Sequence, residues 1–199
     1  MSTAARSAAF ATLALLTACG KPLGTYEVGD VKLVPGSALE KIEPYRKPGP
    51  DLLRIEFTSA TDLYEASKGG GGLYLWGSFC PYDADRRLRT FGPYYNDRNL
   101  YPSAVDDNGK VVEIPDVRPI RDPRTGKYIY TGYLDLASPS DYAWDPPYDL
   151  RRQAADICLR IDNPGYFITP SRSRVFKIPA AMIRASLLKR QAAQLQRRP

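Results

Sequence analysis

Two stretches of the chain alternate strictly between apolar and polar residues. Residues 52–58 place Leu53, Ile55 and Phe57 on one face and polar side chains on the other. Residues 155–162 repeat the pattern, with their apolar side chains again at every second position. Because side chains of a β-strand point alternately to its two faces, this pattern predicts two strands with one face in the core.

Further strands are indicated by apolar runs that end at turn residues. They cover residues 31–34, 73–80, 110–114, 127–136 and 175–178. The chain of 199 residues also contains 18 Pro and 15 Gly, which argue against a helical bundle. About seven short strands separated by Pro and Gly turns predict a mainly β fold, a single antiparallel β-sandwich or a small barrel with long Pro/Tyr-rich loops.

One short helix is expected near the C-terminus. Pro179 suits the first position of a helix because its missing N–H has no partner there. Apolar residues then follow at helical spacing: Ala180, Ile183, Leu187 and Leu188. The alternative is a final strand that runs through Pro179. Residues 189–199 are predicted to form a polar tail.

The first 18 residues have the order of an export signal. Arg6 precedes a short apolar run over residues 10–16, and small residues follow. The run is far shorter than the roughly 20 residues that a membrane-spanning helix needs. Cys19 stands directly after Leu16-Thr17-Ala18, and this order resembles the lipobox of bacterial lipoproteins.

The resemblance implies that residues 1–18 are removed and that Cys19 becomes a lipidated amino terminus. Because no Asp follows the cysteine, it also implies the outer membrane, facing the periplasm. The alternative is an ordinary cleaved signal with a coincidental Cys. We expect residues 19–50 to form a tether and residues 51–188 to form the β-rich domain.

The count of cysteines supports lipidation. The chain has three, Cys19, Cys80 and Cys158, and an odd number in an exported protein leaves one thiol unexplained. Lipidation of Cys19 leaves Cys80 and Cys158 as a predicted disulfide. Cys158 falls on the polar face of its strand, which argues against an immunoglobulin-type bond between two sheets. We expect the bond to join the strand to a neighbour, or to a loop over the outer face.

Candidate chemistry is sparse. The chain has no His, which excludes Ser-His-Asp and Cys-His catalysis and the usual His-bearing zinc sites. Ser186 and Lys189 match the Ser-x-x-Lys of penicillin-binding enzymes, but the accompanying Ser-Asp-Asn and Lys-Thr-Gly boxes are absent. The acidic residues at 83–85 and 106–108 could supply oxygen ligands for Ca²⁺, but we interpret them as turn residues. The four glycines at 69–72 are interpreted as a loop and not as a phosphate-binding site. We predict no enzyme activity, metal site or cofactor.

The most suggestive feature is a set of aromatic residues in proline-rich sequence. Rigid amphipathic rings with adjacent charges are typical of protein-recognition surfaces. The candidates for binding a partner are Tyr94, Tyr95, Tyr101, Tyr142, Trp144 and Tyr148. The alternative is that these rings fill the core beneath long loops. The formal charge of +6 would suit anionic lipid headgroups or an acidic partner, and the alternative is an ordinary solvated basic surface. The compartment argues against nucleic acid.

The C-terminal third carries a second resemblance. Its strand at 157–161, its Gly turn and the segment from Ser173 to Ile183 are similar to the ends of small periplasmic immunity lipoproteins. That resemblance implies neutralisation of a delivered toxin. We therefore predict a lipid-anchored protein that binds another protein with its Tyr-rich loops. The alternatives are a structural lipoprotein of a secretion or envelope-assembly complex and a cell-wall-binding or hydrolytic domain.

Overall fold

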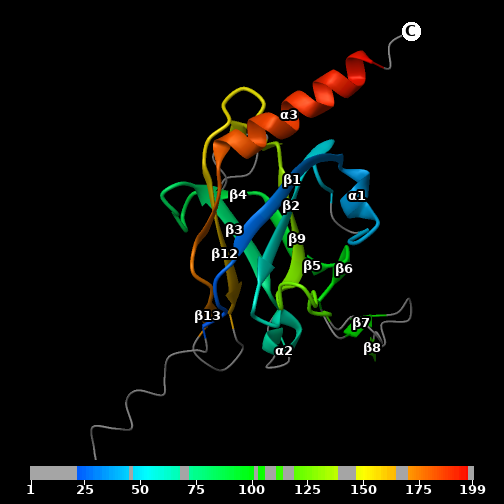
Figure 1. The fold of residues 1–199 in the computed structure, drawn as a ribbon, viewed down its shortest axis with the longest axis vertical. Helices are drawn as coiled ribbons and strands as arrows, with labels where there is room; N and C mark the ends of the chain where they lie inside the picture. The colour runs from blue at the N-terminus through cyan, green and yellow to red at the C-terminus, as the bar shows by residue number, and fades with distance from the viewer. Residues whose placement is uncertain are drawn as a thin grey trace, which may run out of the picture.

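The computed structural model describes residues 22–44, 47–67, 72–100, 103–105, 111–113, 119–138, 147–164 and 170–196. Antiparallel β-strands are the main secondary structure of these residues, as the alternating patterns predict (Figure 1).

The first sheet has the strand order β1-β2-β9-β5-β6. Its strands are β1 (Glu27–Pro35), β2 (Asp51–Ser59), β9 (Tyr128–Asp135), β5 (Thr90–Tyr95) and β6 (Arg98–Asn99). The strands predicted over 31–34, 52–58 and 127–136 are confirmed. In β2 the side chains of Leu53, Ile55 and Phe57 are fully buried, which confirms the predicted inward face.

The second sheet has the order β13-β12-β3-β4, and β14 also pairs with β12. Its strands are β13 (Ser171–Arg172), β12 (Ile157–Asn163), β3 (Tyr74–Phe79), β4 (Arg87–Leu88) and β14 (Phe176–Ile178). These confirm the strands predicted over 73–80, 155–162 and 175–178. The alternate residues Ile157, Leu159 and Ile161 are fully buried, whereas Cys158 lies on the opposite face of β12.

Two small antiparallel pairs complete the strands. They are β7 (Ser103–Val105) with β8 (Val111–Glu113), and β10 (Ala137–Ser138) with β11 (Tyr148–Asp149). Val105 pairs with Val111, and β8 confirms the strand predicted over 110–114. The Asp-Asn-Gly turn at 107–109, like most of the Gly loop at 69–72, lies outside the described residues.

The two sheets pack face to face. Phe57 of β2 meets Phe176 of β14 with ring centroids 5.3 Å apart. Gly132 of β9 permits the close approach, because a Cβ there would lie 2.4 Å from the Leu75 Cδ2 of β3. Across the described residues no strand pairing joins the sheets, so the fold is a sandwich and not the barrel alternative.

A smaller apolar cluster lies apart from the main core. It contains Leu39, Leu52, Phe91, Tyr94 and Tyr133. Leu39 belongs to α1 (Ser37–Glu40), a single helical turn between β1 and β2. Leu52 neighbours the inward-facing Leu53 in sequence, so β2 is buried on both faces at its start.

The buried Tyr130 of β9 holds the segment before α2 (Leu63–Ser67). Its hydroxyl accepts a hydrogen bond from the Leu63 N–H at 3.0 Å and donates one to the Thr61 carbonyl at 2.8 Å. Burial raises the pKa of this phenol well above its ordinary value. The hydroxyl therefore satisfies two backbone groups that the turn into α2 leaves unpaired.

The C-terminal helix α3 runs from Ala180 to Leu195 and excludes the strand alternative. Ile183 is fully buried against the sandwich, but Leu188 is 64% exposed, so its expected place on the packed face is wrong. Ser186 is buried instead. The helix also continues beyond the predicted boundary at residue 188, because Lys, Arg, Gln and Ala over 189–194 are good helix formers.

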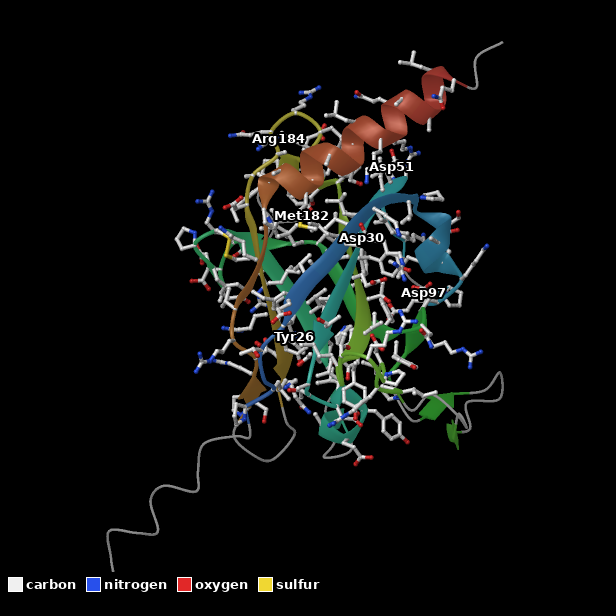
Figure 2. All side chains as sticks on the ribbon, viewed as in Figure 1. Tyr26, Asp30, Asp51, Asp97, Met182 and Arg184 are labelled. Carbon is white, nitrogen blue, oxygen red and sulfur yellow. A yellow bond between two sulfur atoms is a disulfide. The ribbon has the colours of Figure 1, made fainter. Side chains whose placement is uncertain are left out.

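The folded domain begins much earlier than residue 51. Leu23 and Tyr26 are 3% and 6% exposed, and the Tyr26 ring contacts Phe57 and Phe176 (Figure 2). Of the tether expected over 19–50, the described part from residue 23 to residue 44 therefore belongs to the domain. The prolines that suggest a linker are compatible with this, because β1 is an edge strand and Pro35 ends it.

Candidate functional site

The predicted disulfide between Cys80 and Cys158 is present, with the two Cα atoms 5.1 Å apart. Cys158 lies on the outer face of β12, opposite Ser78 of β3, and Cys80 follows the end of β3. The Cys80 N–H also donates to the Asp156 carbonyl at 3.1 Å. The bond therefore clips two neighbouring strands together over the outer face, as the position of Cys158 predicts.

The chain enters the sandwich four residues after Cys19. The Leu23 N–H donates to the Arg172 carbonyl at 3.0 Å, and the Arg174 N–H donates to the Gly24 carbonyl at 3.0 Å. The Ser59 hydroxyl at the end of β2 donates to the Thr25 carbonyl. Residues 23–26 thus touch both sheets. We call this part of the domain, with β13 and the end of β2, the entry end.

Of the six predicted partner-binding rings, Tyr94 and Tyr148 are buried inside the domain and Tyr95 is half-buried. Tyr94 is 1% exposed and meets Tyr133 edge-on at 5.7 Å. Tyr148 is 9% exposed and donates to the Asp135 carbonyl at 3.1 Å. Tyr95 is half-buried and packs against the main core.

These positions correct the prediction for Tyr94 and Tyr148. Their rings fill the core, which is the alternative interpretation, and leave almost no surface for a partner. Tyr101, Tyr142 and Trp144 lie outside the described residues, so for these three the binding of a partner stays a prediction.

An outer-face cluster of aromatic and arginine side chains is not apparent from the sequence. Trp76 stacks on Tyr74 with ring centroids 5.9 Å apart, and the Arg87 guanidinium lies 4.1 Å from the Trp76 centroid. Alternation within β3 places Tyr74 and Trp76 on one face. Arg87 reaches them only because β4 pairs with β3. Such cation–π contacts stabilise by about 0.5–1 kcal/mol at exposed sites.

The same surface contains a tight ion pair. Arg160 of β12 donates through Nε and Nη2 to the two carboxylate oxygens of Asp162, both at 2.6 Å. The hydrogen bond with Asp162 holds the pKa of the guanidinium above its ordinary value. The Arg160 guanidinium also lies 4.6 Å from the Tyr82 ring centroid. This geometry holds the outer face of the second sheet in one arrangement.

A groove of about 590 Å³ separates β1 from α3. It is lined by residues 31–35 and by Ser186, Lys189, Arg190 and Ala193. The strand edge within it is protected. The Asp30 carboxylate accepts the Val31 N–H at 3.0 Å, and Pro35 has no N–H to offer. These devices oppose the pairing of an added strand. Ser186 is buried in this wall, in helical surroundings rather than a catalytic constellation.

The outward face of α3 has no covering element among the described residues. On this face an apolar residue follows at alternating intervals of four and three positions, and all of these residues are exposed: Ala181, Ala185, Leu188, Ala192 and Leu195. Leu188 and Leu195 are 64% and 69% exposed. The helix has three cations and no carboxylate. Figure 1 shows α3 at the end of the domain opposite to β13 and α2.

The most deeply buried carboxylate belongs to Asp135 of β9, which is 0% exposed. Its Oδ1 accepts the Gly49 N–H at 2.9 Å, and its Oδ2 lies 3.3 Å from the Arg89 Nε. Burial raises the pKa of this carboxyl despite both partners. The group fastens residues 47–50 to the sandwich, so we assign it a structural role.

The described ranges contain no cluster of three or more potential metal-ligating side chains. Asp83 instead accepts the Asp85 N–H at 2.9 Å, the turn interaction that the sequence suggests; residues 106–108 lie outside the described ranges. Among the helices described, none has the length and apolar character needed to cross a membrane. Comparison of the chain with known protein families, curated proteins and solved structures gives no match.

Proposed function

We propose that the protein is a lipoprotein of the bacterial cell envelope whose domain binds another protein and performs no catalysis. The observation that carries this proposal is the Cys80–Cys158 bond. It accounts for two of the three cysteines and leaves Cys19, the cysteine of the lipobox, for lipid attachment. A structural disulfide is also typical of an oxidising compartment outside the cytoplasm. By the lipobox resemblance, the anchor lies in the outer membrane and faces the periplasm.

The start of the domain supports an anchoring role. Three residues separate Cys19 from the buried Leu23. Because an extended chain advances about 3.5 Å per residue, Leu23 lies within roughly 14 Å of Cys19. A lipid on Cys19 would therefore hold the entry end close to the bilayer. It would leave α3, at the opposite end, facing the periplasm (Figure 1).

The outward face of α3 is the surface we propose for the protein partner. It combines Leu188 and Leu195 with the exposed Arg184 and Lys189, whereas Arg190 pairs with Asp51. Apolar side chains with a basic surround are complementary to an acidic protein surface with its own apolar residues. An immunity protein would use this face to occlude a toxin. A structural lipoprotein would use it to join an envelope complex.

Metabolic labelling tests the anchor. The full chain is expressed in a Gram-negative bacterium supplied with an alkyne fatty acid, and membrane-bound label is measured. We expect labelling of the wild type and its loss in Cys19→Ala. The matched control is Cys80→Ala with Cys158→Ala, which removes two cysteines and should retain the label. A labelled Cys19→Ala chain, or an unlabelled wild type, would reject the lipoprotein assignment.

Site-specific cross-linking tests the binding surface. A photo-reactive amino acid replaces Leu188 in one chain and Ile120, which is 76% exposed, in the control chain. Both are irradiated in cells grown alongside competitors. We expect one protein to be captured from position 188 and lost when Leu195→Glu is added. A secreted toxin would favour the immunity role, and envelope subunits the structural one. Equal capture from both positions would contradict binding at α3.

A further inference from the structure

We propose that the entry end docks directly onto anionic lipid headgroups through Arg172 and Arg174, so that the domain has one fixed orientation on the membrane. This inference rests on the proposed lipid anchor at Cys19 and adds to it a second contact with the bilayer. The ligands of the two guanidinium groups would be the phosphates of the lipid headgroups.

The two arginines flank the point at which the chain arrives from Cys19. Leu23 bonds to the backbone of Arg172, and Gly24 bonds to the backbone of Arg174. Since Leu23 lies within roughly 14 Å of a lipidated Cys19, both guanidinium groups are brought within reach of the headgroups. The short link therefore supplies the high local concentration that a weak surface contact needs.

Both side chains retain donors for a phosphate. Arg172 is 58% exposed, and its Nε lies 3.9 Å from the Asp162 carboxylate, too far for a hydrogen bond. That carboxylate is already held at 2.6 Å by both donors of Arg160. Arg174 is exposed, and among the residues that the structure describes no carboxylate lies within 4.0 Å of it.

Exposed apolar side chains accompany the arginines. Val175 is 47% exposed and follows Arg174 directly. Tyr74 is 40% exposed and stands in the row of residues that leads through Asp162 to Arg172. Tyrosine rings are favoured at the boundary between water and lipid, where the ring is apolar and the hydroxyl remains wet. The combination suits a headgroup layer better than open solvent.

The first sheet contributes a third apolar side chain at the same end. Ile129 is 40% exposed and is paired with Thr58, the residue before Ser59 at the entry end. The opposite end differs, because Asp51 there already binds Arg190 at 2.7 Å beside α3 (Figure 2). The entry end thus combines the exposed guanidinium groups of Arg172 and Arg174 with exposed apolar residues, next to the point at which the chain arrives from Cys19.

The test uses the full-length lipidated protein, with a photo-reactive amino acid at position 175, reconstituted in vesicles containing phosphatidylglycerol. Mass spectrometry counts lipid adducts. We expect adducts at 175 and few at position 188 of α3. Because each basic residue near an anionic surface strengthens membrane binding roughly 5-fold, Arg172→Gln with Arg174→Gln should lower the ratio of docked to free domain by about 30-fold.

The matched control is Arg151→Gln with Arg152→Gln, a pair on the far side of the sandwich that contacts Asp149. It should leave the adducts at 175 unchanged, whereas vesicles of phosphatidylcholine alone should abolish them. The inference is overturned if positions 175 and 188 give equal numbers of lipid adducts, or if position 175 gives protein adducts in place of lipid adducts. It is also overturned if Arg172→Gln with Arg174→Gln leaves the lipid adducts at position 175 unchanged. The intact mass reports the lipid on Cys19 separately, so failure of the anchor is distinguished from failure of docking.

Discussion

The clearest quantitative prediction concerns removal of the disulfide by Cys80→Ala with Cys158→Ala. The bond joins residues separated by 78 positions, so it restricts about two-fifths of the unfolded 199-residue chain. For a closed loop of about 79 residues, the chain-entropy model gives about 4.5 kcal/mol of stabilisation at 25 °C. The native state keeps β3 beside β12 without the bond, because the strand pairing and the Cys80–Asp156 backbone hydrogen bond remain. We therefore expect the loss to come mainly from the unfolded state.

Urea unfolding under oxidising conditions measures the effect. We expect the free energy of unfolding to fall by about 3–5 kcal/mol and the thermal midpoint to fall by roughly 10 °C. The slope of the free energy of unfolding against urea concentration should become steeper, because an unfolded chain without the disulfide exposes more surface. Cys19→Ala, which keeps the Cys80–Cys158 bond, is the control and should change neither quantity. A loss below about 1 kcal/mol, or an unchanged urea dependence, would refute the unfolded-state explanation.

Three smaller perturbations test other parts of the fold by the same urea measurement. Tyr130→Phe should lower the free energy of unfolding by about 2 kcal/mol, because two backbone groups lose their hydrogen-bond partner. The control is Tyr95→Phe, whose hydroxyl accepts a hydrogen bond from an exposed N–H, and it should lower that free energy by less than about 0.5 kcal/mol. Equal losses would contradict the proposed role of Tyr130. Gly132→Ala should cost about 1–3 kcal/mol, since the new methyl group meets Leu75 between the sheets, and a neutral result would show that the sheets can separate. Because burial raises the folded-state pKa of Asp135, the folded state binds the proton more tightly than the unfolded state, and wild-type stability should fall relative to Asp135→Asn as the pH rises from about 4 through that raised pKa. A stability difference independent of pH would exclude this titration.

The sequence predicts the strands best where one face meets water. In β12 alternation predicts both the buried row and the outward position of Cys158, and hence where the disulfide lies. The pattern fails in β5, where Gly92 and Pro93 interrupt the run and suggest a loop. The structure accommodates them with a register shift between Phe91 and Tyr94, so the strand continues and buries Tyr94. Tyr94, which the sequence assigns to a binding loop, therefore belongs to the core.

Composition and periodicity also do not show which strands lie beside one another in a sheet. Arg87 reaches Trp76 because β4 lies beside β3, and the side chain of Arg160 reaches Tyr82 across a turn. The first strand illustrates the same limit. Residues 22–50 contain five prolines and suggest a tether, yet Pro35 costs no ladder hydrogen bond at the end of an edge strand. Burial of Leu23 and Tyr26 then leaves only a short link after Cys19.

The length of that link, rather than the distribution of charge, would determine which end of the domain meets the membrane. Cations occur at both ends, as Arg172 and Arg174 at the entry end and as three residues of α3 at the other. A domain of this size has a radius of gyration of about 16 Å, so its two ends lie about 40 Å apart. A link that reaches roughly 14 Å cannot bring α3 to the bilayer to which Cys19 would be attached. With a link of three residues, the lipid that we propose on Cys19 would select the entry end for the membrane and would leave α3 for the proposed partner in the periplasm.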